Sequence, residues 1–224
     1  SNLSRKYKNI DEDYFEELEN ILIMADLVEK QILKSVENIK KYDRDLVEDI
    51  IKDDDNIDDL YQLVEEECII FIATEQPLAK DLRYVFMATK IATELERMGD
   101  HAVDICKAIR NIGISPKIIP EELLKLYDME EKVRKMINLS VNAYIKRDYE
   151  AAYDICKMDD TIDELYNNIF NTMIRVIKRE DIQSDVVAQL LFVAKYLERI
   201  GDRVTNICEG IIFAKKGTYV DLNE

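Results

Sequence analysis

The sequence predicts an all-α protein that contains two tandem three-helix bundles, built from six long helices. Apolar residues recur at spacings of three and four nearly from end to end, which is the pattern of amphipathic helices. The 224 residues include only 5 Gly and 3 Pro, so the chain can form few turns. Several motifs of the first half return in the second half, which indicates a duplicated unit.

Five breaks in the apolar pattern delimit the helices. They lie at Lys41-Tyr42-Asp43, at Gln76-Pro77, from Gly113 to Pro120, at Lys146-Arg147-Asp148 and from Arg179 to Ser184. Five breaks give six helices of about 30 residues, or roughly 45 Å each at 1.5 Å per residue. Only the third break is rich in Pro and Gly. We therefore expect the first three-helix bundle in residues 1–113 and the second in residues 114–224.

The first two helices of each half correspond at an offset of 105 residues. The first and fourth helices match because this offset places Met24 on Met129. The second and fifth helices share an acidic motif, since residues 54–61 read Asp-Asp-Asn-Ile-Asp-Asp-Leu-Tyr and residues 159–166 read Asp-Asp-Thr-Ile-Asp-Glu-Leu-Tyr. Each pair of helices therefore has the same place in its bundle.

The third and sixth helices correspond at an offset of 102 residues. Residues 95–100 read Leu-Glu-Arg-Met-Gly-Asp, and residues 197–202 read Leu-Glu-Arg-Ile-Gly-Asp. The change in offset falls between the second and third helix of each half. Hairpin loops absorb such changes in length most easily, so the slip is compatible with a duplicated bundle.

Composition excludes several classes of function. The chain has 31 basic and 47 acidic side chains, a net charge of −16, which argues against nucleic acid or an acidic membrane surface as a partner. A single His excludes His-rich metal sites, and the glycines form neither a P-loop nor a dinucleotide-binding turn. The four Cys lack metal-binding spacing and the chain opens with no secretory leader, so we expect reduced thiols in a cytoplasmic protein.

Carboxylates interrupt the inward stripe of the second and fifth helices. Asp54 lies on the stripe with Ile50 and Ile57, and Asp159 lies on the stripe with Ile155 and Ile162. The third and sixth helices carry further acids at i, i+4 spacing, which places each pair on one helix face. The acids that share faces in this way are Asp54 with Asp58, Glu96 with Asp100, Asp159 with Asp163, and Glu198 with Asp202.

Antiparallel packing would bring these acids to one level of each hairpin. Residue numbers 58 and 96 average to 77, as do 54 and 100, and residue 77 is the proline of the turn. In the second half, 163 with 198 and 159 with 202 both average to 180.5, inside the predicted break. We therefore expect four carboxylates to meet in each half, roughly 28 Å from the turn.

A cluster of four carboxylates repels itself and must be neutralised. Protons, arginines or metal ions could do this, and hard cations fit best because every candidate ligand is a carboxylate oxygen. We predict a multinuclear, carboxylate-bridged metal site in each half. Asp55 and Asp59 could supply a second layer of carboxylates around this metal site. The alternative interpretation of the residue 53–59 run is a solvated acidic surface or a helix cap.

Three further features have two interpretations each. Gly99 and Gly201 lie inside helices, where glycine costs about 1 kcal/mol relative to alanine, so they serve either close helix packing or room beside a metal cluster. Arg97 and Arg199 either screen the acids or bind phosphate. The segment Gln76 to Arg83 has no copy in the second half and is either a turn with a helix start or a docking surface.

These motifs together resemble the PhoU family, the accessory and regulatory proteins of bacterial phosphate-specific transport. The resemblance rests on Gln-Pro-Leu-Ala-Lys-Asp-Leu-Arg at residues 76–83, the two Glu-Arg-Met/Ile-Gly-Asp segments and the two Asp-xxx-Asp segments, and it runs from about Tyr14 to Gly217. It implies two PhoU-type bundles whose Glu/Asp-xxx-Asp motifs bind iron or zinc clusters in some members. Carried over by position, the ligands are Asp54, Asp58, Glu96, Asp100, Asp159, Asp163, Glu198 and Asp202.

The resemblance also implies a regulatory role rather than an enzyme. PhoU-like proteins act in the cytoplasm, where they couple the ATPase of the phosphate ABC transporter to a sensor histidine kinase and repress the phosphate-starvation response. The membrane would be reached only through these partners, and we expect a weak homodimer. The alternatives are a structural spacer and a metal-storing or redox bundle of the di-iron type, which uses a Glu-xx-His motif that this sequence lacks.

Overall fold

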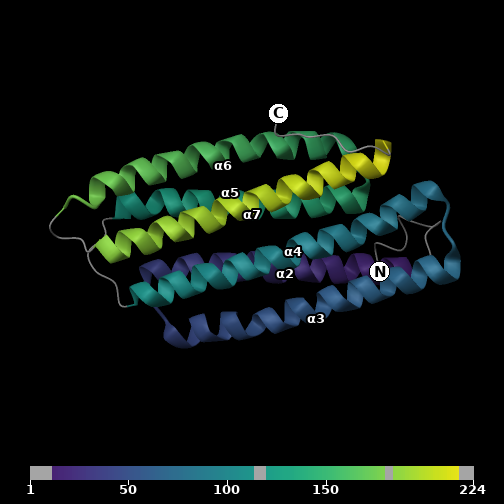
Figure 1. The fold of residues 1–224 in the computed structure, drawn as a ribbon, viewed down its shortest axis with the longest axis horizontal. Coiled ribbons are helices and arrows are strands. Elements are labelled where there is room, and N and C mark those ends of the chain that lie inside the picture. Colours follow the sequence, from purple (N-terminus) through teal and green to yellow (C-terminus); the bar gives the residue numbers. More distant parts are fainter. Residues whose placement is uncertain (1–11, 114–119, 180–183, 217–224) are drawn as a thin grey trace.

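The computed structural model describes residues 12–113, 120–179 and 184–216, and these form six long α-helices (Figure 1). The helices contain 27 to 34 residues each. They are α2 (Glu12–Lys40), α3 (Arg44–Glu75), α4 (Ala79–Ile112), α5 (Pro120–Lys146), α6 (Tyr149–Val176) and α7 (Ser184–Lys216). The predicted all-α fold is confirmed, and the helix ends fall within the five predicted breaks or within a few residues of them.

Capping residues mark the helix ends at three of the five breaks. Asp43 begins α3 because its carboxylate accepts hydrogen bonds from the backbone N–H groups of Asp45 and Leu46, at 3.1 and 3.2 Å. Gln76 ends α3 in a left-handed conformation with φ 45°, and Pro77 follows it. Asp148 caps α6 through the N–H of Ala151 at 3.1 Å. Short polar residues at these joints therefore set where the helices start.

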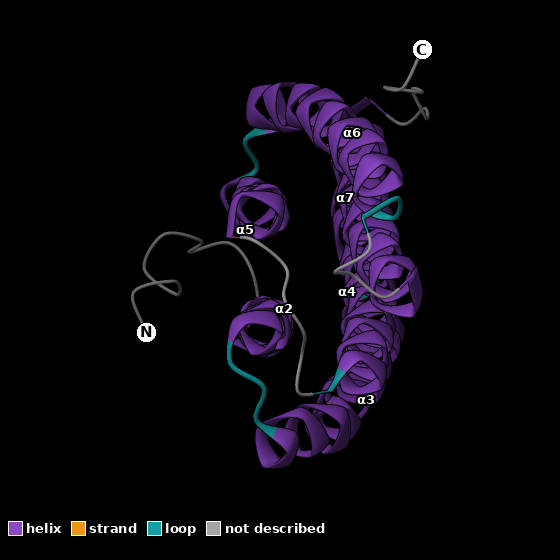
Figure 2. Ribbon diagram, turned by 90° about the vertical axis from the view of Figure 1, so that its left-hand side faces the viewer, coloured by secondary structure: helices purple, strands orange, loops and turns teal. Residues whose placement is uncertain are grey.

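The two bundles share one core. Helices α2, α3 and α4 form the first bundle, and α5, α6 and α7 form the second, yet the most extensive contact between any two helices joins α4 to α7. Viewed along the helices, α3, α4, α7 and α6 form a curved layer, and α2 and α5 lie side by side on its concave face (Figure 2). The largest cluster of buried apolar side chains runs through both bundles.

The predicted pair of three-helix bundles is confirmed, but the sequence did not indicate how tightly they pack together. At Gly210 on α7, a β-carbon would collide with the side chain of Met87 on α4. The end of the Met87 side chain therefore packs directly against the α7 backbone, in the space that this glycine leaves free. The division of the chain between residues 113 and 114 stays a prediction, because residues 114–119 lie outside the described part.

The buried thiols belong to the core. All four cysteines are buried and none forms a disulfide, and the Cys106 sulfur lies 2.9 Å from the hydroxyl oxygen of Ser35. Among the helices described, none has a stretch apolar enough and long enough to cross a bilayer.

Candidate metal centres

Each half of the molecule brings together three aspartates from two antiparallel helices. Asp54 and Asp58 of α3 and Asp100 of α4 each offer an oxygen, and these oxygens all lie within 4.8 Å of one another. Asp159 and Asp163 of α6 and Asp202 of α7 form the same arrangement. In each half, three of the four carboxylates that were expected to meet do so, which agrees with the level predicted from the hairpin turn.

Glu96 and Glu198 lie at the margin of these groups. The charges of Asp100 and Asp58 help to raise the pKa of Glu96, so its carboxylate lies near them. The charge of Glu198 helps to raise the pKa of Asp163 and Asp202, so its carboxylate lies near these two acids. We use "first cluster" for Asp54, Asp58, Glu96 and Asp100, and "second cluster" for Asp159, Asp163, Glu198 and Asp202. All eight predicted acids thus lie in or beside the two groups.

The innermost acid of each cluster has an oxygen without a hydrogen-bond partner. Among the described residues, the Oδ1 atoms of Asp54 and Asp159 are buried and accept no hydrogen bond. Asp159 is only 4% exposed. A buried, unpaired carboxylate oxygen costs stability, so these two atoms are suited to a ligand that carries positive charge.

Two glycines make room for these oxygens. A β-carbon at Gly99 would lie 2.9 Å from the Oδ1 of Asp54, and a β-carbon at Gly201 would lie 2.9 Å from the Oδ1 of Asp159. The next nearest atoms belong to Ile57 and Ile162, at 3.4 and 3.5 Å. The glycines therefore let the neighbouring helix and its carboxylate pack closely, which is the first of the two interpretations; room beside a metal cluster stays a prediction.

Burial and mutual repulsion raise the pKa of nearly every acid in the two clusters. Burial, followed by the charges of Asp58 and Asp100, raises the pKa of Asp54 to about 6. Burial, followed by the charges of Asp163 and Asp202, raises the pKa of Asp159 to about 7. The pKa is also raised, first by burial, for Asp58, Glu96, Asp100, Asp163 and Asp202. Without a counter-charge, each cluster therefore tends to hold a proton.

Two residues that contact the clusters are not among the predicted acids. Gln31 of α2 is 5% exposed and hydrogen-bonds to Asp54, which lowers the pKa of that acid, while its own Oε1 has no partner among the described residues. Lys195 of α7 places its Nζ 2.7 Å from the Oε1 of Glu198. A polar residue on the apolar stripe of the first helix was the signal for Gln31. The i, i+3 spacing to Glu198 was the signal for Lys195.

The arginines and the histidine near the motifs have structural contacts. The charge of Arg97 lowers the pKa of Glu96 and Asp100, which supports the screening interpretation. His101 stacks against Tyr196, with ring centroids 6.1 Å apart, at the contact between α4 and α7. Arg97 therefore lies near the carboxylates, and His101 belongs to neither group of three aspartates.

Segment 76–83 forms the turn before α4 and the first residues of that helix. Leu78 is 81% exposed there, so both the structural interpretation and the docking interpretation of this segment stay open.

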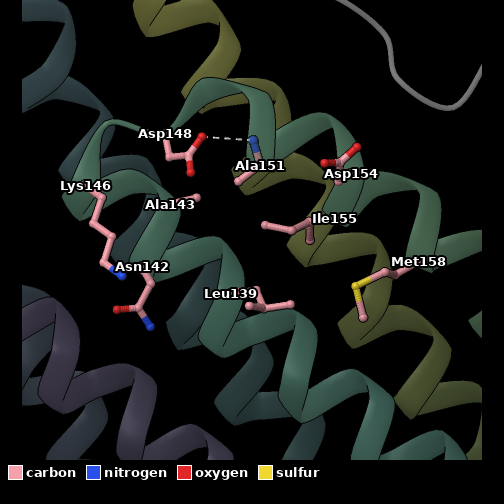
Figure 3. Close-up of a pocket in the computed structure, with 9 residues that line it drawn as sticks. All are labelled: Leu139, Asn142, Ala143, Lys146, Asp148, Ala151, Asp154, Ile155 and Met158. Carbon is pink, nitrogen blue, oxygen red and sulfur yellow. Dashed lines mark hydrogen bonds between the residues drawn. The ribbon is translucent and has the colours of Figure 1, made fainter.

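A hollow between α5 and α6 lies apart from the acidic motifs (Figure 3). It has a volume of about 290 Å³, and Leu139, Ile155 and Met158 contribute apolar lining. None of the eight predicted acids lines it. The hollow is therefore not part of either candidate metal centre.

Comparison with known proteins identifies the repeated unit. The PhoU domain matches residues 21–109 and again residues 126–211, one match for each bundle. A phosphate-specific transport system accessory protein PhoU homolog of Clostridium acetobutylicum is 44% identical over 220 residues, which cover 97% of this chain and 99% of that protein. The phosphate-specific transport system accessory protein PhoU of Escherichia coli is 31% identical, over 94% of this chain and 88% of that protein.

Solved structures share the whole arrangement of helices. The crystal structure of PhoU from Pseudomonas aeruginosa superposes with a TM-score of 0.81 at 27% identity, over 92% of this chain and 98% of that one. The phosphate transport system regulatory protein PhoU from Streptococcus pneumoniae gives a TM-score of 0.84 at 26% identity, over 93% and 97%. Two matched repeats and near-complete coverage of these relatives show that the chain belongs to the PhoU family.

Proposed function

We propose that this protein regulates phosphate uptake and signalling from the cytoplasm. In this proposal it couples the ATPase subunit of a phosphate ABC transporter to a sensor histidine kinase and represses the phosphate-starvation response. Membership of the PhoU family supports the link to phosphate transport, since relatives are named accessory proteins of the phosphate-specific transport system. The protein acts as an adaptor rather than as an enzyme, and it reaches the membrane only through its partners.

We further propose that each cluster binds divalent cations, with iron, zinc or another divalent ion as candidates. The observation that carries this proposal is the buried Oδ1 of Asp159, which has no hydrogen-bond partner in the described residues and faces Gly201. Gln31 adds a second buried oxygen without a partner beside the first cluster. All-oxygen donor sets suit hard or borderline cations. The residues that would hold the ions are the members of the first and second clusters.

The bound ions would supply positive charge that neutralises acids from two neighbouring helices. Asp54 and Asp58 come from α3 while Asp100 comes from α4, so neutralising this group removes the repulsion between the two helices. The same holds for α6 and α7 in the second half. Cation binding would therefore stabilise both hairpins in the arrangement that partners recognise.

Capture of the partners tests the regulatory role. The full chain is immobilised and exposed to the transporter ATPase and, separately, to the cytoplasmic part of the sensor kinase. We expect capture of both, with less capture after treatment with a chelator. The double variant Asp54→Asn with Asp159→Asn serves as the matched control, because it should bind equally with and without the chelator. Failure to capture either partner would contradict the regulatory role.

The metal-storing or redox bundle makes a different prediction. Oxidation of iron by oxygen in such a bundle consumes oxygen, so an oxygen-uptake assay on iron-loaded protein separates the two functions. We expect no uptake above that of iron alone, because the sequence lacks the Glu-xx-His motif of the di-iron bundles.

A further inference from the structure

We infer that the two clusters bind divalent cations with unequal affinity, and that Lys195 sets the difference by occupying an acid of the second cluster. The first cluster then fills at a lower cation concentration than the second. The inference rests on the proposed cation binding and concerns this chain's own departures from the duplicated pattern.

Lys195 is a cation built into the second cluster. Its Nζ lies 2.7 Å from the Oε1 of Glu198, and the Glu198 side chain is only 15% exposed. The same Nζ lies 5.1 Å from the ring centroid of Tyr166, which favours a cation at this place. A metal ion that recruits Glu198 must therefore displace the ammonium group or share the carboxylate with it.

The first cluster has a neutral residue at the equivalent position. The offset of 102 residues places Thr93 opposite Lys195. The hydroxyl of Thr93 donates a hydrogen bond to the carbonyl of Thr89 at 2.9 Å and also hydrogen-bonds with Tyr61, the counterpart of Tyr166. Glu96 thus has no lysine partner where Glu198 has one.

Two further substitutions change the charge in the same direction. The negative charge of Asp104 helps to raise the pKa of Asp100 in the first half, and the neutral Asn206 replaces Asp104 in the second. Glu65, which acts on Glu96, is replaced by Phe170, whose ring packs 6.5 Å from that of Tyr166. Each of the three differences makes the surroundings of the second cluster more positive by one charge.

The nearby arginines do not cancel this difference. The charge of Arg97 lowers the pKa of Glu96 in the first cluster, and the charge of Arg203 lowers the pKa of Asp202 in the second. Each cluster therefore has one arginine that lowers the pKa of an acid. A unit charge within several ångströms of a divalent ion changes its binding constant by roughly tenfold or more, even when water screens the pair. We therefore expect at least a tenfold difference in dissociation constant.

Titration with Mn²⁺ tests the inference on the full chain. The protein is first treated with a chelator, and free Mn²⁺ is then followed by electron paramagnetic resonance while heat is followed by calorimetry. We expect two classes of site. Asp54→Asn should remove the tight class, and Asp159→Asn should remove the weak class.

Exchange of the lysine between the two halves gives the decisive variants. Lys195→Thr should tighten the weak class roughly tenfold, and Thr93→Lys should weaken the tight class by a similar factor. Lys195→Arg keeps the charge and is the matched control, which should leave both classes unchanged. Circular dichroism of each variant checks the fold, and Lys195→Gln provides a second neutral variant if Thr93→Lys does not fold.

The outcomes separate the inference from the proposal beneath it. Two classes that respond as described support both. Equal affinities, a tighter second cluster, or no response to Lys195→Thr and Lys195→Gln would overturn the inference and leave cation binding intact. Absence of Mn²⁺ binding in the unaltered chain would overturn the proposed cation binding and the inference together.

Discussion

Asp54 and Asp159 occupy equivalent places in the two halves but have different neighbours. Asp54 is half-buried and hydrogen-bonds with Gln31, and its pKa is raised to about 6. Asp159 is 4% exposed, has Met136 at the position equivalent to Gln31, and its pKa is raised to about 7. The difference shows that duplication has preserved the carboxylates but not the groups that compensate them.

The backbone geometry around Asp54 and Asp159 is nearly the same, whereas the charged and polar side chains around them differ. Each Oδ1 lies 2.9 Å from the β-carbon position of a glycine on the neighbouring helix. The residues that differ, such as Gln31 and Lys195, lie outside the repeated motifs. Equal geometry and unequal surroundings mean that the two clusters should respond differently to cations, to pH and to substitution.

Removal of divalent cations should have the largest effect on stability. A site with cation at 100 times its dissociation constant stabilises a protein by about 2.7 kcal/mol, so two sites give about 5 kcal/mol. For a chain of this size we expect the melting temperature to fall by about 10–20 °C on adding a chelator. Asp54→Asn and Asp159→Asn should each remove part of this shift. A melt that does not change with the chelator would show that neither cluster binds cations.

The pH dependence of the cation-free protein should be dominated by the second cluster. Asp159 has a pKa of 3.8 when unperturbed and about 7 in the folded protein, so the folded state holds more protons between these values. Stability should therefore fall as pH rises from about 4 to about 7, by up to roughly 4 kcal/mol. Asp159→Asn should flatten the dependence of the melting temperature on pH. Asp54→Asn should flatten it less, and the reverse order would contradict the comparison.

Substitution of the two glycines should distinguish the clusters by burial. Gly201→Ala should destabilise the protein by about 1–2 kcal/mol, because the new methyl group crowds a carboxylate that cannot move into solvent. Gly99→Ala should cost less, because Asp54 is half-buried and can shift. Denaturant unfolding measures both. In an Asp159→Ala background, Gly201→Ala should become neutral or stabilising by up to about 1 kcal/mol, since alanine favours the helix.

Exchange of the residues beside Asp54 and Asp159 should give the smallest effect. Gln31→Met removes the hydrogen bond to Asp54, so its pKa should rise toward that of Asp159. Met136→Gln should lower the pKa of Asp159 if the new amide reaches it. A change of about one unit corresponds to about 1.4 kcal/mol, and carbon NMR of the aspartate carboxyls during a pH titration measures it. Unchanged titration of Asp54 in Gln31→Met would exclude the amide as the cause of the difference.

The sequence predicted the helices and the level of the acids because both follow from regular geometry. A fixed rise per residue and a turn at Pro77 are enough to place Asp54 opposite Asp100. It did not predict Gln31, because a pattern of apolar residues shows which face is buried but not which helix covers it. The contact between α4 and α7 was missed for the same reason. Cation binding itself stays a prediction.

The seam between α4 and α7 determines how the molecule can be divided. A gene fragment that encodes residues 1–113 alone would leave the α7-facing surface of α4 in water, including Met87, which is 2% exposed in the whole chain. Such a fragment would tend to aggregate or to pair with another copy. Co-expression of the two fragments should restore a folded complex, because each supplies the surface that the other lacks.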